Sequence, residues 1–451
     1  MHIHILGICG TFMGGIAQIA RKLGHDVTGS DQNVYPPMSD QLEKAGIDLM
    51  QGYKAEHLQP VPDIVIVGNT ISRGNPALEA VLNKQIPFTS GPEWLYNAVL
   101  KNKHVLAVSG THGKTTTTTI LSWILEYAGL NPGFLIGGVA ENFGISARYT
   151  DSDYFVIEAD EYDTAFSDKR SKFIHYHPKT LIINNIEFDH ADIFHDIADI
   201  RREFHHLMRI LPEQARVIFP KEDEEVKKVL DMGCWSNKES FSMKVSANWS
   251  IAEASTDFHR FKVIHEGNEV GEVNWSLIGE HNANNALAAI IAAEHIGIDV
   301  GKACTALSEF KSVKRRLECL FESNGTRIYD DFAHHPTAIS KTLEALRQHA
   351  PDNRIIAVME PRSNTMRMGY HAETLAASFE KADQVLLFQA DNVDWDIAKN
   401  MTELGERCRV FKDIEAIVSL IAEQHQPGDQ IVVMSNGGFG GIHKKLIEVL
   451  S

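Results

Sequence analysis

Short apolar runs alternate along the chain with longer segments in which apolar residues recur at helical spacing. The short runs predict strands and the longer segments predict helices, an alternation typical of parallel sheets covered by helices. The predicted strands are Ile3–Leu6, His25–Thr28, Ile64–Val67, Pro87–Phe88, Val105–Val108, Tyr154–Ile157, Leu181–Ile183, Val217–Phe219, Arg327–Tyr329, Ile355–Val358, Gln384–Phe388 and Gln430–Met434. The predicted helices lie near Gly14–Leu23, Asn282–Ala293, Pro336–His349, Ala372–Ala382 and Ile414–Glu423. We therefore expect an α/β protein.

Two basic stretches interrupt this alternation. Lys101–His104 precedes one fresh apolar strand, and Lys311–Arg316 precedes another restart of the pattern. At roughly 150 residues per domain, 451 residues suffice for about three domains. We expect domains at residues 1–101, 102–314 and 315–451, the first and last of them Rossmann-like.

Composition and charge narrow the class of protein. The chain has 43 basic and 60 acidic residues, a formal net charge of −17, which disfavours non-specific binding to nucleic acid or anionic membranes. Its longest apolar stretch, Ala286–Ala293, is far below the roughly 20 residues of a membrane span. The start, Met1–Gly7, shows no signal-peptide pattern. Five scattered cysteines without a Cys-x-x-Cys pair fit a reducing compartment, and we expect a cytoplasmic protein.

The strongest local motif is a phosphate-binding loop between the strand Val105–Val108 and a helix. Glycines allow backbone N–H groups to approach phosphate oxygens, Lys114 supplies positive charge, and the Thr115 hydroxyl can ligate Mg²⁺. The full motif has a glycine where this chain has Val108, so a plain turn before a threonine-rich helix is the alternative. The motif predicts a P-loop ATPase-like central domain. Its candidate ATP-binding residues are Gly110, Thr111, His112, Gly113, Lys114, Thr115, Thr116 and Thr117.

Two acidic segments follow later strands of the same block. Glu158–Glu161 comes after Tyr154–Ile157, and Asn184–His190 comes after Leu181–Ile183. Both are expected at the carboxyl edge of the sheet, where α/β proteins bind ligands. One carboxylate with the Thr115 hydroxyl would suffice for Mg²⁺, although each segment alone also fits a solvated loop.

A second glycine loop, Gly7–Gly15, follows the first strand, and Asp31 follows the second. The loop reads Gly-x-x-Gly-x-x-x-Gly, which is weak evidence for any one cofactor. It is consistent with a diphosphate at a helix N-terminus, or with a tight turn needed only for packing. The candidate ligand-binding residues of this block are Gly7, Gly10, Gly14, Asp31, Thr70 and Arg73.

With these motifs in order along nearly the whole chain, the sequence resembles the Mur ligases, the ATP-dependent family that adds amino acids to UDP-N-acetylmuramic acid. The matching pieces are Gly7–Gly15, Gly110–Thr116, Glu158–Glu161, Asn185–His190, Gly279–Asn285, Arg315–Leu317 and Asp330–Pro336. The resemblance implies a UDP-sugar-binding domain at 1–101, an ATP-binding domain at 102–314 and an acceptor-binding domain at 315–451.

Four strings are most similar to the recycling branch of the family. They are Gly7–Gly15, Gly233–Ser236, Glu360–Thr365 and Ser435–His443. This branch joins the lactyl carboxylate of UDP-N-acetylmuramate to a murein tripeptide, L-alanyl-γ-D-glutamyl-meso-diaminopimelate. The alternative within the family is a UDP-N-acetylmuramate–L-alanine ligase, and a distant one is an NAD(P)-dependent oxidoreductase. The oxidoreductase alternative does not explain the phosphate-binding motif Gly110–Thr116.

The resemblance also implies roles for single residues. It places Lys114 at the ATP β and γ phosphates, Thr115 and Glu158 at one Mg²⁺, and His190 at a second. It places Asn282 and Asn285 near the adenine, Asp331 at the ribose, and Arg315 or Arg316 at the γ phosphate, so that Lys114, Arg315 and Arg316 are the catalytic candidates. Some relatives bridge Mg²⁺ with a carbamylated lysine, but no lysine occurs here between Lys179 and Lys221.

The implied chemistry activates the lactyl carboxylate as an acyl phosphate, which the acceptor amine then attacks, releasing phosphate. The group that takes the amine proton stays open at this point among His112, His334 and His335. Arg362, with Ser363 and Asn364, follows the strand Ile355–Val358 and is expected to bind acceptor carboxylates. A surface ion pair is the alternative for Arg362.

Overall fold

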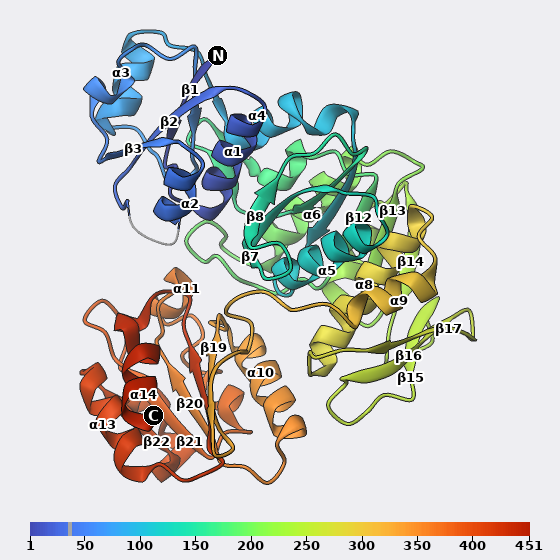
Figure 1. Ribbon diagram of the computed structural model, residues 1–451, viewed down its shortest axis with the longest axis vertical. Helices are drawn as coiled ribbons and strands as arrows, with labels where there is room; N and C mark the ends of the chain where they lie inside the picture. The colour runs from blue at the N-terminus through green and yellow to red at the C-terminus, as the bar shows by residue number, and fades with distance from the viewer. Residues whose placement is uncertain (35–37) are drawn as a thin grey trace.

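The computed structural model describes residues 1–34 and 38–451 and divides the chain among three large sheets with helices packed on them (Figure 1). The N-terminal part is blue in the figure, the central part runs from teal to yellow, and the C-terminal part is orange to red. In the described ranges, each helix is too short or too polar to cross a membrane.

The first sheet has five parallel strands in the order β3-β2-β1-β4-β5. Its strands are β1 (His2–Leu6), β2 (Asp26–Asp31), β3 (Asp48–Gln51), β4 (Ile64–Val67) and β5 (Phe88–Ser90). Its helices are α1 (Thr11–Lys22), α2 (Met38–Lys44), α3 (Pro76–Asn83) and α4 (Gly91–Ala98), with short 3₁₀ turns η1 (Ala55–Leu58) and η2 (Leu100–Asn102). This doubly wound order reverses between β1 and β4, where the Gly7–Gly10 loop lies, and sheets of this kind generally bind ligands at such a switch point.

The central sheet has ten strands in the order β17-β16-β15-β14-β13-β12-β6-β9-β7-β8. Its strands are β6 (His104–Ser109), β7 (Gly133–Ala140), β8 (Ile145–Arg148), β9 (Tyr154–Glu158), β12 (Thr180–Ile183), β13 (Arg216–Pro220), β14 (Asn237–Phe241), β15 (Trp249–Ala252), β16 (Arg260–His265) and β17 (Asn268–Asn274). Its helices are α5 (Lys114–Tyr127), α6 (Ile197–Ile210), α7 (Glu224–Asp231), α8 (Glu280–His295) and α9 (Val300–Leu307). A separate hairpin, β10 (Asp163–Ala165) and β11 (Asp168–Ser171), leads into η3 (Lys172–His175).

Alternate residues of β6 enter two different cores. Leu106 and Val108 join the core under α5 and α8, while Val105 and Ala107 join the core that contains α6. Burial on both faces explains why this strand reads as a continuous apolar run. In the sheet, β6 lies between β12 and β9, near the middle. The phosphate-loop motif follows β6 directly and so lies at the carboxyl edge of the sheet.

The C-terminal sheet has six strands in the order β18-β19-β23-β20-β21-β22, of which β18 alone pairs antiparallel. Its strands are β18 (Glu318–Ser323), β19 (Thr326–Asp331), β20 (Ile355–Met359), β21 (Gln384–Phe388), β22 (Cys408–Phe411) and β23 (Gln430–Met434). Its helices are α10 (Pro336–His349), α11 (Asn364–Arg367), α12 (Ile397–Asn400), α13 (Ile414–Gln424) and α14 (Ile442–Leu450), with η4 (Ala376–Phe379), η5 (Thr402–Arg407) and η6 (Phe439–Gly441).

The α/β class and the three-part architecture are confirmed, and each predicted strand is present, with ends that match or differ by a few residues. The helix predicted at Ala372–Ala382 is wrong, because the segment holds turns and the single 3₁₀ turn η4. The Ser378 hydroxyl donates to the Leu375 carbonyl at 2.6 Å and so competes for a carbonyl that an α-helix would use. The antiparallel pairs β7–β8 and β15–β16–β17 were also not predicted, since their exposed faces break the apolar runs.

Candidate active site

The phosphate loop connects β6 to α5, and its glycines are required by its shape. Gly110 has φ of +119° and Gly113 has φ of +81°, both in the left-handed region. A Cβ on Gly110 would lie 2.8 Å from the Asn185 carbonyl oxygen, and one on Gly113 would lie 2.6 Å from Asn285 Oδ1. The loop is therefore pressed against two other segments. Val108, which replaces the first glycine of the full motif, is buried in β6.

Lys114 opens α5 and points toward two carboxylates. Its Nζ lies 2.9 Å from Glu161 Oε2 and 3.4 Å from Asp160 Oδ1. Burial alone would lower the pKa of Lys114, but the Glu161 and Asp160 carboxylates hold it above its ordinary value. The ammonium is therefore charged and held at the N-terminus of a helix, where a phosphate group binds favourably.

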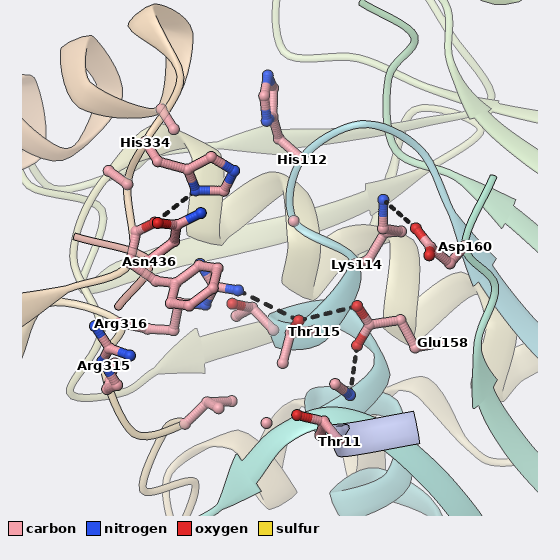
Figure 2. A pocket seen from close by; sticks show the side chains of 18 of the residues that line it. Thr11, His112, Lys114, Thr115, Glu158, Asp160, Arg315, Arg316, His334 and Asn436 are labelled. Atoms are coloured by element: carbon pink, nitrogen blue, oxygen red, sulfur yellow. Dashed lines mark hydrogen bonds and ion pairs between the residues drawn. The ribbon is translucent and has the colours of Figure 1, made fainter. Parts of the chain in front are cut away.

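Thr115 lies between residues of two domains, as Figure 2 shows. Its Oγ1 is 3.1 Å from Glu158 Oε1 and 3.3 Å from Nη2 of Arg316. The other oxygen of Glu158 accepts the Gly137 N–H at 2.7 Å. Burial raises the pKa of Glu158. A hydroxyl and a carboxylate side by side at a phosphate loop form an oxygen donor set that fits Mg²⁺.

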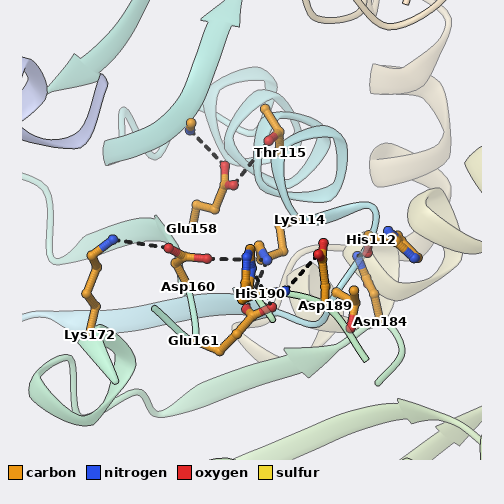
Figure 3. A network of polar contacts seen from close by, with 12 residues as sticks. His112, Lys114, Thr115, Glu158, Asp160, Glu161, Lys172, Asn184, Asp189 and His190 are labelled. Carbon is orange, nitrogen blue, oxygen red and sulfur yellow. Dashed lines mark hydrogen bonds and ion pairs between the residues drawn. The ribbon is translucent and has the colours of Figure 1, made fainter. Parts of the chain in front are cut away.

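A second acidic group lies beside Lys114 (Figure 3). One ligand atom from each of Asp160, Glu161 and His190 lies within 4.8 Å of the others. His190 Nε2 is 3.4 Å from Glu161 Oε1, and Glu161 is only 1% exposed. Lys172 Nζ binds Asp160 Oδ2 at 3.1 Å. Lys172 was not predicted as a site residue, because nothing in the sequence marks a lysine after a hairpin as a partner of this cluster.

Two adjacent asparagines hold the phosphate loop in place. Asn185 Oδ1 accepts the His112 N–H at 2.8 Å, and its backbone carbonyl accepts the Thr111 N–H at 3.1 Å. Asn184 Nδ2 donates to Thr117 Oγ1 at 3.0 Å. Thr117 is thus buried behind the loop, whereas Thr116 lines the cavity in front of it.

The phosphate loop lies in a cavity of about 2230 Å³ that residues of all three sheets line. Asn282 and Asn285, at the start of α8, line it beside Gly113. Among the predicted residues of the first domain, those that line it are Gly7, Gly10, Asp31, Thr70 and Arg73. Gly14 does not; it lies in α1, where a Cβ would be 2.4 Å from Met38 Sδ.

Asp31 organises the first glycine loop by accepting two backbone hydrogen bonds. Its Oδ2 accepts the Cys9 N–H at 2.8 Å and its Oδ1 accepts the Asn33 N–H at 3.0 Å. Arg73 is largely exposed at the rim and pairs with Glu79 at 2.9 Å. Asp31 and Arg73 therefore both lie at the cavity, and each also makes hydrogen bonds within the protein.

The two arginines of the connector point in different directions. Arg315 donates to the carbonyl oxygens of Ser435 at 2.6 Å and Gly437 at 2.7 Å, and its Nε lies 3.2 Å from Asp330 Oδ2. Arg316 instead reaches Thr115. Of the two candidates for a phosphate-binding arginine, the geometry favours Arg316.

Asp331, expected at the ribose, also lines the cavity, but its carboxylate shapes the connector. One oxygen accepts the Leu317 N–H and the other the Ala333 N–H, each at 2.8 Å. Burial raises the pKa of Asp331 despite the nearby Arg316. This role of Asp331 was not predicted, because the N–H groups of Leu317 and Ala333 that donate to it lie on opposite sides of β19 in the sequence.

The predicted acceptor residues line a side chamber of about 280 Å³. Arg362 is half exposed, and a Cβ on Gly437 would lie 2.3 Å from Arg362 Nη1, so this glycine leaves room for the guanidinium. Ser363 Oγ accepts the Met366 N–H at the start of α11, and Asn364 donates to Asp192 at 3.2 Å. Ser363 and Asn364 therefore shape the chamber, and Arg362 contributes a guanidinium to its lining.

Two threonines of the C-terminal domain hold the segment before His190, and neither was predicted. Thr337 Oγ1 donates to Glu187 at 2.6 Å, and Thr365 Oγ1 donates to Asp189 at 2.9 Å. His112, Glu187 and His335 form one further acidic and histidine group. Hydrogen bonds within the protein explain why these three side chains lie together. His112 Nε2 lies 3.2 Å from Glu187, and His335 Nδ1 accepts the Thr337 N–H at 3.3 Å.

Comparison with known proteins places this architecture in a family. Three family models match consecutive parts of the chain: "Mur ligase family, catalytic domain" at 2–102, "Mur ligase middle domain" at 108–293, and "Mur ligase, glutamate ligase domain" at 315–437. Together they span most of its length.

Full-length relatives agree with these matches. The chain is 55% identical to UDP-N-acetylmuramate–L-alanyl-γ-D-glutamyl-meso-2,6-diaminoheptandioate ligase of Escherichia coli K12, covering 100% of this chain and 98% of the relative. It is 31% identical to UDP-N-acetylmuramate–L-alanine ligase of Caldanaerobacter subterraneus, covering 99% and 97%. A crystal structure of a murein peptide ligase of Psychrobacter arcticus 273-4 matches with a TM-score of 0.77 and 46% identity, covering 100% and 98%. The chain belongs to the Mur ligase family of ATP-dependent ligases.

Proposed function

We propose that this enzyme joins the lactyl carboxylate of UDP-N-acetylmuramate to the amine of L-alanyl-γ-D-glutamyl-meso-diaminopimelate, with ATP converted to ADP and phosphate. The observation that carries this proposal is the full-length likeness to a ligase of that name. The reaction reuses a murein tripeptide and so serves peptidoglycan recycling. The five cysteines of the described residues are free thiols, which fits a reducing compartment. Together with the nucleotide-linked substrates, they fit a cytoplasmic enzyme.

We assign the UDP-sugar to residues 1–101, ATP to 102–314 and the acceptor to 315–451. A single cavity joins residues of all three segments, which supports this division. The UDP-sugar would lie along the Gly7–Gly10 loop and Asp31, with Thr70 and Arg73 at its rim. The adenine would lie near Asn282 and Asn285, beside the phosphate loop.

The first step activates a carboxylate that is otherwise a poor electrophile. The lactyl carboxylate attacks the γ phosphorus of ATP, and ADP leaves. Lys114 at the helix N-terminus and Arg316 from the connector place positive charge around the transferring phosphoryl group, which is mainly electrostatic catalysis. Mg²⁺, when bound by Thr115 and Glu158, would neutralise further phosphate charge.

The second step makes the amide bond. The acceptor amine attacks the acyl phosphate, and phosphate leaves. Arg362 in the side chamber offers a planar guanidinium that matches a carboxylate with two parallel hydrogen bonds. The tripeptide carries several carboxylates, whereas alanine carries one. Arg362 would therefore favour the longer acceptor.

A direct assay tests the proposal. The protein is incubated with ATP, UDP-N-acetylmuramate and either the tripeptide or L-alanine, and ADP and the product mass are measured. We expect the tripeptide product, with a much higher kcat/KM than for alanine. Preferred use of alanine would instead establish the alanine ligase. A change in NADH absorbance with these substrates and no ADP would support an oxidoreductase.

A further inference from the structure

His334 lies where the side chamber opens into the main cavity. Five residues line both spaces, namely Asp189, His190, His334, Arg362 and Asn436. The phosphate loop borders one space and the proposed acceptor residues border the other. If the proposed function holds, the acyl phosphate and the acceptor amine meet at this opening.

The tautomer of His334 follows from one hydrogen bond. Its Nδ1 lies 2.9 Å from the Phe332 carbonyl oxygen. A carbonyl oxygen only accepts, so the hydrogen of the neutral ring is on Nδ1 and the lone pair is on Nε2. Across residues 1–34 and 38–451, Nε2 has no hydrogen-bond partner from the protein.

We propose that His334 is the general base that takes a proton from the acceptor amine. Burial lowers the pKa of His334, so the ring is neutral and able to accept a proton near pH 7. Asp189 lies close enough to interact with it electrostatically. Asp189 Oδ1 accepts hydrogen bonds from the His190 N–H at 2.7 Å and from the Thr365 hydroxyl at 2.9 Å, and both favour the ionised carboxylate. This ionised carboxylate would stabilise the imidazolium that forms.

The other histidines of the site are less suitable. His112 Nε2 faces Glu187 at 3.2 Å. His335 Nδ1 receives the Thr337 N–H, and its Nε2 is sealed from the cavity. His190 Nε2 faces Glu161 at 3.4 Å. Of the two histidines that line both spaces, His190 is paired with a carboxylate, whereas His334 has none within 4.0 Å among the described residues.

The acceptor nitrogen, as the free amine, attacks the carbonyl carbon of the acyl phosphate, and the carbonyl π electrons move to oxygen. His334 Nε2 takes the proton that the nitrogen loses as the N–C bond forms. The carbonyl then re-forms, and phosphate leaves with the electron pair of the C–O bond. The imidazolium gives its proton to water in the cavity.

Hydroxylamine separates this role from a structural one. It is largely unprotonated at neutral pH and needs little help to lose its proton, so it reports acyl phosphate formation as a hydroxamate. The test compares ATP-dependent hydroxamate formation from UDP-N-acetylmuramate with tripeptide ligation in wild type, His334→Asn and His335→Gln. We expect His334→Asn to lose roughly 10²- to 10⁴-fold in ligation and less than about threefold in hydroxamate formation.

Two further measurements sharpen the result. Imidazole should partly restore ligation in His334→Ala, and at fixed pH the restored rate should rise with the concentration of added imidazole. His335→Gln should leave the ratio of the two activities unchanged. Equal losses of both activities in His334→Asn, or no loss in either, would overturn the assignment. A wild-type protein that forms neither ADP nor hydroxamate would overturn the proposed function and the assignment with it.

Discussion

Nη2 of Arg316 lies 3.3 Å from Oγ1 of Thr115, so that an arginine from the connector contacts the second residue of α5 in the central domain. The neighbouring Arg315 points into the C-terminal domain instead. The backbone explains the divergence, because Arg315 has φ of +63° and Leu317 has φ of +49°, both left-handed. The connector bends on either side of Arg316 and presents that side chain to the phosphate loop.

The two arginines should therefore differ when each is replaced. We expect Arg316→Ala to lower kcat by roughly 10²-fold or more, because a guanidinium that stabilises phosphoryl-transfer charge is lost. Arg315→Ala should change kcat little but cost about 1–3 kcal/mol of stability, since it breaks hydrogen bonds to two carbonyl groups. Steady-state ADP release and thermal unfolding of both variants check this. The reverse pattern would exchange the two roles.

Lys114 should matter for both catalysis and stability. Lys114→Met should nearly abolish ADP release, because the phosphate loop loses its ammonium. It should also lower the melting temperature, because the buried Glu161 loses a counter-ion at 2.9 Å. The double variant Lys114→Met/Glu161→Gln should regain stability without regaining activity. Ligation close to wild type in Lys114→Met would contradict the assignment of the phosphate loop.

Glu158 should set the Mg²⁺ requirement more strongly than Glu161. Glu158 contacts Thr115, whereas Glu161 contacts Lys114 and His190. We expect Glu158→Gln to raise the Mg²⁺ concentration for half-maximal activity by at least about tenfold. Mg²⁺ titrations of Glu158→Gln and Glu161→Gln provide a matched pair. A larger shift in Glu161→Gln would move the first metal ligand to that residue.

Arg362 should determine the preference for the tripeptide. Arg362→Lys keeps the charge but removes the paired geometry, so kcat/KM for tripeptide should fall by roughly tenfold. The activity with hydroxylamine as nucleophile should not change, since that nucleophile has no carboxylate. Kinetics with both nucleophiles give the comparison. An unchanged kcat/KM for tripeptide would leave Arg362 with only its weak contact to Glu360.

His4 should make the first domain less stable in mild acid. It is buried between Thr28 and Ser30 hydroxyls, and burial lowers its pKa from 6.5 to about 4. As the pH falls from 6.5 toward 4, the unfolded chain binds a proton that the folded chain resists, so stability decreases by up to about 3 kcal/mol. The melting temperature should therefore drop less in His4→Gln than in wild type between pH 7.5 and pH 5.

The sequence predicted the strand–loop–helix setting of Gly110–Thr115 correctly, because that setting is local. Glycines, Lys114 and Thr115 follow one another between a strand and a helix, so their spacing alone brings them to one ligand. The carboxylates of Glu158–Glu161 were also predicted correctly at the edge of the sheet, since a parallel strand ends there. These predictions needed only the periodicity of strands and helices.

Contacts between distant segments could not be predicted in this way. Thr365 and Asp189 are 176 residues apart, and Lys172 reaches Asp160 only because the β10–β11 hairpin turns the chain back. The role of Ser363 at the start of α11 was missed for another reason. The string around it was interpreted as substrate-binding, although serine is also a common helix cap.

The sequence by itself determined the α/β alternation, the three-part order and the position of the Gly110–Thr115 loop between a strand and a helix, because each depends on residues close together in the chain. Only the tertiary structure decided that Arg316 and not Arg315 contacts Thr115, that Asp331 holds the connector, and that His334 has a free Nε2 at the opening of the chamber. Side-chain direction depends on backbone bends and on packing between domains. These arise from many weak contacts at once, and no local pattern of residues encodes them.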